Sequence, residues 1–335
     1  MRAQEVIAAL GWPVTLREVG LKLFNKEPAV ACYLPSSYLY RWRDVLKDQK
    51  VDVYELDIRP TDRYLMERFI AGSARIHGGQ WRSGDNLTVA SCWQSATDVQ
   101  LTPGDYRPDL RYLSVDIETS FPRTDEPDRL FSIAFYAPEF SHVLMISDQE
   151  GDSYEAVADE PALLTRFLEV IAAYDPDVLI GWNFIQFDMA FLRRKFAEHD
   201  IPFALGRDGS LLDWRQSAQN PDRIFLHTPG RVILDGIECL RTATWQFDSF
   251  ALDDVADQLL GEGKLLHGEE RGGDIERLFV EDKQALAAYN LKDCELVWRI
   301  FEHTDLFNFL IERSRMTGLL MDRMGGSVAA FEYMY

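Results

Sequence analysis

Residues 112–199 carry strand and helix patterns in a fixed order, and this order constrains the fold more than any other feature of the sequence. Strand patterns lie at 112–118, 130–136, 142–146 and 178–182, and helix patterns lie at about 160–174 and 188–199. The run 178–182 is continuously apolar, which is typical of a strand buried on both faces. Strands followed by strand–helix alternation predict an α/β fold built on a mixed sheet flanked by helices.

Before residue 110 the sequence predicts a smaller α+β unit. Its patterns are an apolar segment at 29–34, a polar helix at about 38–47, an alternating stretch at 51–56, a short helix at 64–70 and a strand-like piece at 87–93. Turn signals at Pro103 and Pro108 mark a boundary near residue 110. Residues 200–250 are expected to be mostly irregular with one strand at 232–234, and a helix is expected at about 282–302.

The charge of the chain is divided unevenly. Of the 35 basic and 55 acidic residues, 14 of each kind lie in residues 1–110, so residues 111–335 carry the whole formal charge of −20. This asymmetry suggests two regions with different tasks, within a length that suits two or three domains. A surplus of carboxylates opposes non-specific binding of nucleic acid, but clustered carboxylates also build magnesium sites. The alternative is a solvated acidic surface.

The composition also excludes several protein classes. No apolar run approaches 18 residues, so we expect no membrane span. The four cysteines form no C-x-x-C pair and share no zinc-ligand spacing with the six histidines, which argues against a disulfide framework or a zinc site. The N-terminal residues do not match a secretory signal, and we therefore expect a cytoplasmic protein.

The strand pattern at 112–118 carries two acids on one face. Its period of two places Val115 and Ile117 on one side and Asp116 and Glu118 on the other. The two Cα atoms would lie roughly 6.6 Å apart, close enough for both side chains to reach one divalent ion. An edge strand with a solvated acidic face is the alternative.

Three further residues are candidates for chemistry. Asp188 follows the buried strand and opens a helix, where an aspartate often serves only as a cap. Tyr289 and Asp293 are four residues apart on one face of the expected C-terminal helix. An exposed helical aspartate beside a half-buried tyrosine is the ordinary alternative. The combination and order of the acids carry more weight than any one of them.

The order D-x-E, N-x-x-x-F-D and Y-x-x-x-D resembles that of proofreading 3′–5′ exonucleases. Other segments resemble the bacterial polymerase II family of family B DNA polymerases, from about residue 20 onward. These are YLMERFI at 64–70, GRV at 230–232, LLGEGK at 259–264, YNLKDCE at 289–295 and GGSVAAF at 325–331. The D-T-D and S-L-Y-P motifs of the polymerase domain are not found in this sequence, which is therefore expected to be a fragment unable to polymerise alone.

The resemblance implies a domain organisation. Residues 1–110 would form the N-terminal domain and 111–305 a ribonuclease-H-like 3′–5′ exonuclease domain. Residues 306–335 would form a helical segment that leads toward an absent polymerase domain and packs on the N-terminal domain. The partners implied are a DNA 3′ end or primer–template, the missing polymerase domains, and a sliding clamp reached through the absent part.

The resemblance also implies roles for the acids. Two Mg²⁺ or Mn²⁺ ions would drive hydrolysis of the 3′-terminal phosphodiester and release deoxynucleoside monophosphates. Asp116, Glu118 and Asp293 would hold one ion, while Asp116 and Asp188 would hold the other, Asp188 through water. The hydroxyl of Tyr289 would orient the attacking water.

Residues beside these acids are implied to contact the terminal nucleotides. They are Thr119, Asn183 and Phe187, and for Phe187 a place in the core is an equal alternative. The basic run at 193–195 either touches DNA or lies on a solvated helix face. A DNA-binding scaffold whose exonuclease is silent without the polymerase domains is the competing function, and a self-standing exonuclease of the same superfamily is a third.

Overall fold

The chain divides into two units, Met1–Ile70 and Ala71–Tyr335, and each is described by itself. The structure is a computed structural model that describes residues 11–23, 25–56, 58–83, 91–94, 99–121, 127–216, 224–262 and 271–324. The segments 87–90 and 325–331, on which two of the sequence expectations rest, lie outside these residues, and so does Lys264. The expected domain limits at 110 and 305 remain predictions.

The first unit is a strand pair followed by helices. β1 (Thr15–Lys22) pairs antiparallel with β2 (Pro28–Tyr33), and η1 (Ser36–Tyr38), α2 (Leu39–Asp48) and α3 (Pro60–Met66) follow. Trp42 and Leu46 lie four residues apart on α2 and are both buried, so this helix turns one face inward. The apolar segment at 29–34 and the polar helix at 38–47 are thus confirmed.

Two expectations for this unit are wrong. Residues 51–56 form no strand, because Glu55 has φ 58°, a left-handed conformation that a strand cannot contain. The helix expected at 64–70 lies at 60–66 instead, because Pro60 occupies its first turn, where a proline loses no hydrogen bond. Phe69, with φ 56°, lies beyond its end.

A six-stranded mixed sheet organises the second unit, in the order β10-β9-β8-β7-β11-β14. Its strands are β7 (Tyr112–Thr119), β8 (Leu130–Ala137), β9 (Phe140–Ile146), β10 (Glu155–Val157), β11 (Val178–Gly181) and β14 (Val232–Asp235). β7, β8 and β9 are antiparallel neighbours, whereas β11 runs parallel to both β7 and β14. The expected mixed α/β sheet is confirmed.

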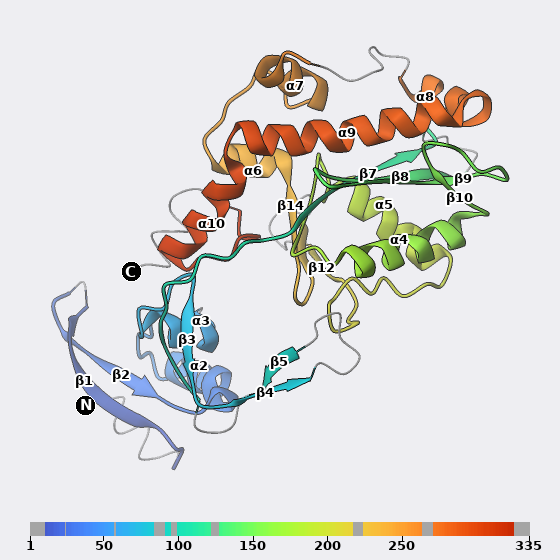
Figure 1. Cartoon of the computed structure of the whole chain (residues 1–335). Coiled ribbons are helices and arrows are strands. Elements are labelled where there is room, and N and C mark those ends of the chain that lie inside the picture. The colour runs from blue at the N-terminus through green and yellow to red at the C-terminus, as the bar shows by residue number, and fades with distance from the viewer. Residues whose placement is uncertain are drawn as a thin grey trace. The chain divides into compact units, whose positions relative to one another are not determined.

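Helices cover both faces of this sheet (Figure 1). α4 (Glu160–Tyr174) and α5 (Asp188–Glu198) bury Phe167 and Leu192 against one face, together with Val115 of β7. α8 (Arg271–Glu281) and α9 (Lys283–His303) cover the other face, where Phe279 packs with Phe131 of β8. The sheet is therefore a middle layer with helices packed on both of its faces.

The second unit contains further strands and helices. They are β3 (Ala74–His77), β4 (Gln80–Ser83), β5 (Ser91–Gln94), β6 (Gln100–Pro103), β12 (Asp213–Gln216), β13 (Ile224–His227), α6 (Gly236–Thr242), α7 (Leu252–Leu260) and α10 (Leu306–Thr317). The region 200–250 is thus more regular than expected, because β12, β13 and α6 join the one strand predicted there. No helix in the described ranges is both long and apolar enough to cross a membrane.

Candidate metal centre

β7 places two acids in the interior of the sheet. It lies between β8 and β11, with Asp116 opposite Ala134 and Glu118 opposite Ser132. Glu118 is buried and Asp116 is half-buried, while Val115 lies in the core on the opposite face. The alternative of an edge strand with a solvated acidic face is therefore wrong.

Asp293 joins these two acids from above the sheet. It lies on α9, which packs across β7 and β8 (Figure 1). Its side chain is buried. One carboxylate oxygen from each of Asp116, Glu118 and Asp293 lies within 4.8 Å of the others. Carboxylates held this closely away from water repel one another, and a bound cation relieves the repulsion. The structure thus brings together three of the four acids that the sequence indicated.

Asp188, the fourth acid, stands at the first turn of α5. Its Oδ1 accepts a hydrogen bond of 3.1 Å from the backbone nitrogen of Ile117 on β7. Burial raises the pKa of Asp188 well above its ordinary value, and the nearby charge of Asp116 raises it further. Asp188 therefore connects α5 to the acid-bearing strand, a link between elements that a helix cap alone would not make.

Gly181 allows the turn before Asp188 to pack close to β7. It ends β11, and a Cβ atom placed on it would lie 2.6 Å from the Phe184 ring and 2.8 Å from the carbonyl oxygen of Val115. Contacts that short do not occur in proteins, so either the turn or the strand would have to move. The distance between Asp188 and β7 therefore depends on the absence of a side chain at Gly181.

Tyr289 lies one helical turn before Asp293 on α9. Only 2% of this residue is exposed, so the half-buried tyrosine expected as the ordinary alternative is wrong. Its ring belongs to an apolar cluster that includes Phe131 and Phe279. The ring is thus held in place by the same cluster that seats α8 and α9 on the sheet.

The three residues expected to contact the terminal nucleotides lie on the segments that carry the acids. Thr119 ends β7 next to Glu118 and is half-buried. Asn183 and Phe187 are exposed in the turn between β11 and α5, where Asn183 adopts a left-handed φ of 52°. Phe187 is 45% exposed, so its alternative place in the core is wrong.

Two buried polar residues beside Asp116 were not predicted from the sequence. The Nδ2 of Asn290 on α9 donates to Oδ2 of Asp116 at 2.7 Å. The Oγ of Ser132 on β8 donates to Oδ1 of Asn290 at 2.8 Å. Both residues are fully buried. The only signal in the sequence is that Asn290 lies between Tyr289 and Asp293.

Asp235 is a further buried acid near the site. It is the last residue of β14 and the N-cap of α6, where Oδ1 accepts from the Ile237 nitrogen at 3.0 Å and Oδ2 from the Ile185 nitrogen at 3.2 Å. Burial raises the pKa of Asp235 to about 6. Asp235 thus fixes the turn before Asp188 to the end of a neighbouring strand. A single aspartate after an apolar strand is too common a pattern to have revealed this.

The basic run at 193–195 makes contacts within the protein. Lys195 is buried, and its Nζ lies 3.3 Å from a Glu160 oxygen. Arg194 pairs with Asp128 at 2.7 Å, and Arg193 lies over the Trp214 ring at 4.8 Å from its centroid. Lys195 thus anchors α5, whereas Arg193 and Arg194 are exposed, and a contact of these two arginines with DNA stays a prediction.

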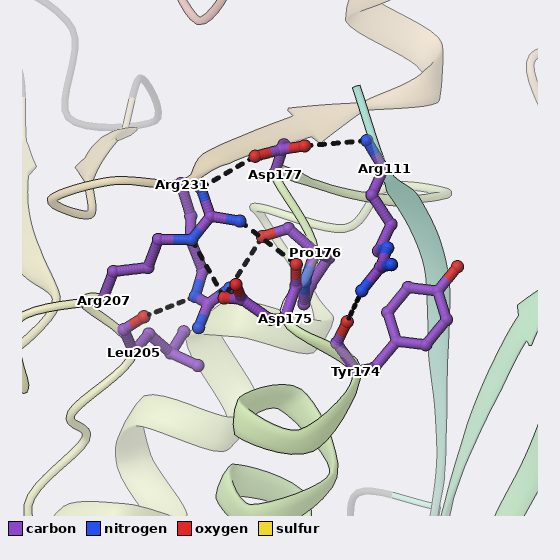
Figure 2. Close-up of polar contacts among 8 residues, drawn as sticks. All are labelled: Arg111, Tyr174, Asp175, Pro176, Asp177, Leu205, Arg207 and Arg231. Carbon is purple, nitrogen blue, oxygen red and sulfur yellow. Dashed lines mark hydrogen bonds and ion pairs between the residues drawn. The ribbon is translucent and has the colours of Figure 1, made fainter. Parts of the chain in front are cut away.

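Arginines and aspartates form a compact network before β7, β11 and β14. Figure 2 shows the guanidinium groups of Arg207 and Arg231 meeting at Asp175, where each lies within 2.9 Å of Oδ1. Arg207 also pairs with Asp177 at 2.7 Å, and Oδ2 of Asp177 accepts from the Arg111 nitrogen at 2.8 Å. The three parallel strands are thus connected at the end remote from the acids.

A family model for "DNA polymerase family B, exonuclease domain" matches residues 51–255. Among curated relatives, DNA polymerase II of Escherichia coli is 41% identical over 96% of this chain and 40% of its own length. A DNA polymerase of a Desulfurococcus species is 25% identical over 82% of this chain and 31% of its own length. The chain therefore spans less than half of either relative.

A solved structure has a similar fold. It is a family B DNA polymerase from the archaeon Pyrobaculum calidifontis, with a TM-score of 0.70 and 20% identity. The match covers 99% of this chain and 43% of that chain. At this identity the likeness concerns the fold alone.

Proposed function

This chain belongs to the exonuclease-domain family of the family B DNA polymerases and is a homologue of E. coli DNA polymerase II, and from that premise we propose that it acts as a 3′–5′ proofreading exonuclease. Its reaction is hydrolysis of the 3′-terminal phosphodiester of DNA, which releases one deoxynucleoside monophosphate at a time. The observation that carries the proposal is the group formed by Asp116, Glu118 and Asp293, whose oxygens lie within 4.8 Å of one another.

The donor set suits a hard divalent cation. All of the side chains in the group offer carboxylate oxygens, which Mg²⁺ and Mn²⁺ prefer. Two such ions, when bound, supply activation of the attacking water and stabilisation of the departing 3′ oxygen. In this proposal Asp116, Glu118 and Asp293 hold one ion, and Asp116 and Asp188 hold the other, Asp188 through water. Burial first, and then the charge of Asp116, raises the pKa of Asp188, and a bound cation would offset both effects.

The other residues position the substrate. The hydroxyl of Tyr289 orients the attacking water, and the buried ring keeps that hydroxyl at a fixed place on α9. Phe187 offers an exposed ring face on which a terminal base stacks, a contact worth about 1–3 kcal/mol per base. Asn183 and Thr119 contact the same terminal nucleotides. A single-stranded end is recognised by such stacking rather than by reading base edges.

We extend the proposal to the domains and partners. An N-terminal domain at 1–110, an exonuclease domain at 111–305 and a helical segment at 306–335 would lead to polymerase domains and, through them, to a sliding clamp on cytoplasmic DNA. Contacts of α10 with earlier residues support the expected place of the last segment. Arg107 pairs with Glu312 at 3.0 Å, and Arg315 pairs with Asp105 at 3.1 Å.

The proposal is tested with a 5′-labelled single-stranded DNA oligomer. The chain is incubated with Mg²⁺, Mn²⁺ or chelator, and the products are resolved by size. We expect a metal-dependent ladder that shortens from the 3′ end and is lost in the double variant Asp116→Ala with Glu118→Ala. The control is Glu150→Ala with Asp152→Ala, which removes the same charge at the same spacing from exposed positions. Equal cleavage by both double variants would refute the assignment.

A second measurement separates binding from hydrolysis. Tyr289→Phe keeps the buried ring and removes only the hydroxyl, so we expect slower single-turnover hydrolysis with unchanged Mn²⁺ binding.

The competing function is a DNA-binding scaffold whose exonuclease is silent. The observation in its favour is the formal charge of −20, because this charge should weaken capture of the DNA 3′ end by the exonuclease site. DNA binding without any ladder would support the scaffold and contradict the exonuclease.

A further inference from the structure

Asn290 and Ser132 form a hydrogen-bonded chain that ends on Asp116. Asn290 donates to Asp116 Oδ2 at 2.7 Å, and Ser132 donates to Asn290 Oδ1 at 2.8 Å. Neither Asn290 nor Ser132 is exposed to solvent. A buried amide or hydroxyl without a partner costs about 1–3 kcal/mol, so both groups are strongly held to these partners.

The chemistry of the three groups fixes the direction of the chain. An ionised carboxylate only accepts hydrogen bonds, so the NH₂ side of the Asn290 amide must face Asp116. The amide oxygen then faces the other way, where it needs a donor, and the Ser132 hydroxyl supplies one. A flipped amide would set its oxygen against the carboxylate. The Asp116 carboxylate thus determines which side of Asn290 it meets, and the Ser132 hydroxyl satisfies the amide oxygen on the other side.

The chain also joins three elements of the candidate metal centre. Ser132 lies on β8 directly opposite Glu118, Asn290 lies three residues before Asp293 on α9, and Asp116 lies on β7. Asp116 is half-buried, whereas Glu118 and Asp293 are buried. The hydrogen bond from Asn290 to Oδ2 restricts rotation of the Asp116 carboxylate and presents Oδ1 in one direction.

We propose that Asn290 is a positioning residue that orients Asp116 for the metal ions, with Ser132 as its anchor. The proposal rests on the function proposed above, in which Asp116 serves both ions. Partners that orient a metal-ligating carboxylate without touching the metal typically contribute 10- to 100-fold to metal affinity or activity. A bond that only fastened α9 to the sheet would change stability and leave metal affinity unaltered.

The experiment measures Mn²⁺ binding to the full chain by titration calorimetry, in wild type and in Asn290→Ala, Ser132→Ala and the double variant. We expect affinity to fall about 10-fold in Asn290→Ala and by a smaller factor in Ser132→Ala. The double variant should bind no more weakly than Asn290→Ala, because both residues act along one path. In the nuclease assay, half-saturating Mn²⁺ should rise while the rate at saturating Mn²⁺ recovers most of its wild-type value.

Controls distinguish this role from folding. Asn308→Ala and Ser147→Ala remove the same side chains from α10 and from the end of β9, and both should bind Mn²⁺ as wild type does. Thermal unfolding in chelator reports whether each variant is folded. Ser132→Ala leaves the bond from Asn290 to Asp116 available, so it tests the proposal even where Asn290→Ala folds poorly.

The possible results have separate meanings. Weakened Mn²⁺ binding in folded Asn290→Ala or Ser132→Ala, with normal binding in the controls, supports the positioning role. Wild-type affinity in folded Ser132→Ala and Asn290→Ala overturns it and leaves the proposed exonuclease intact. Wild-type protein that binds no Mn²⁺, or that binds it no better than Asp116→Ala with Glu118→Ala, overturns the metal centre and this inference together.

Discussion

Aspartates at the two ends of the parallel strands β7, β11 and β14 have opposite electrostatic surroundings. Before the strands, Asp175 and Asp177 lie against Arg207 and Arg231. Toward the other ends, the charges of Asp116 and Asp235 both act on Asp188, and the hydrogen bonds that Asp188 and Asp235 accept come from backbone nitrogens. Arginines neutralise the aspartates at the first end, whereas backbone nitrogens hold Asp188 and Asp235 at the second.

The pKa shifts at the two ends follow this difference. Burial tends to raise the pKa of Asp175, but the hydrogen bonds and charges of Arg207 and Arg231 outweigh burial and lower it. For Asp188, burial raises the pKa and the charge of Asp116 adds to the rise. One end therefore contributes to holding the fold together, and the other carries a repulsion that a bound cation would relieve.

The largest expected effect is at the neutralised end. The side chain of Arg231 is 2% exposed, and Arg231→Met leaves a partly buried Asp175 with one arginine fewer. We expect the free energy of unfolding to fall by about 3 kcal/mol in urea denaturation. The reason is that Asp175 stays partly removed from water while it loses part of the opposite charge that compensated for its lost hydration. Arg215→Met, which breaks an exposed pair with Asp213, should leave the free energy of unfolding almost unchanged. Equal losses would remove the distinction between a buried network and a surface pair.

The next effect concerns pH at the acidic end. The pKa of Asp235 is about 6, above its ordinary value of 3.8, so the folded protein holds this proton more tightly than the unfolded chain. The stability that the proton contributes is complete below about pH 4 and is lost as the pH rises through 6. We expect a loss of roughly 3 kcal/mol in chelator, since the shift is about two pKa units and one unit is worth about 1.4 kcal/mol.

Two variants separate the ends in that titration. Asp235→Asn should reduce the decline between about pH 4 and 6, while Asp188, whose pKa is also raised, keeps its share. The pKa of Asp175 is lowered, so its contribution is present above about pH 4 and disappears as the pH falls further; Asp175→Asn should lower stability above about pH 4 and remove this dependence at acid pH. A decline that persists unchanged in Asp235→Asn would assign the titration to another group.

A smaller effect is expected from adding metal to the acidic end. Mn²⁺ at ten times its dissociation constant should raise the free energy of unfolding by about 1.4 kcal/mol, because it binds only the folded state. Differential scanning calorimetry with Mn²⁺ and with chelator measures this. The shift should vanish in Asp116→Ala with Glu118→Ala and persist in Glu150→Ala with Asp152→Ala. A shift of equal size in all three proteins would locate the ion elsewhere.

The smallest effect on stability is expected at the edge of the acidic end. Phe187 is 45% exposed, so Phe187→Ala should change the free energy of unfolding by less than about 0.5 kcal/mol. Binding of a single-stranded oligomer, measured by fluorescence anisotropy in chelator, should nevertheless weaken about fivefold through lost stacking. Loss of stability without loss of DNA binding would return Phe187 to a packing role.

The sequence predicts the central sheet and its long helices well. α4, α5 and α9 agree with the patterns to within one residue, because an amphipathic period repeated over three or more turns outweighs local exceptions. β12 and β13 are four residues each, too short to show a period, and were missed. Residues 51–56 alternate as a strand would, but one left-handed residue, Glu55, is enough to prevent it.

The candidate site divides in the same way. The spacing of Asp116 and Glu118 on one strand, and of Tyr289 and Asp293 on one helix, is a local property and is readable from the sequence. The bond between Ser132 and Asn290 joins residues 158 positions apart, so it depends on the register of β8 and on the placement of α9. The arginine network likewise arises only when three strands are assembled.

Gly181 has a consequence for how this protein tolerates change. Any side chain there would meet the Phe184 ring or the Val115 carbonyl oxygen, and so would displace either the turn before Asp188 or the strand that holds Asp116. In a library of all single substitutions selected for nuclease activity, we expect this position to accept replacements as rarely as the acids do. Gly181 has no functional group, yet it would score as essential. Interpretation of such a library would therefore have to separate residues that the chemistry requires from residues whose small size the packing requires.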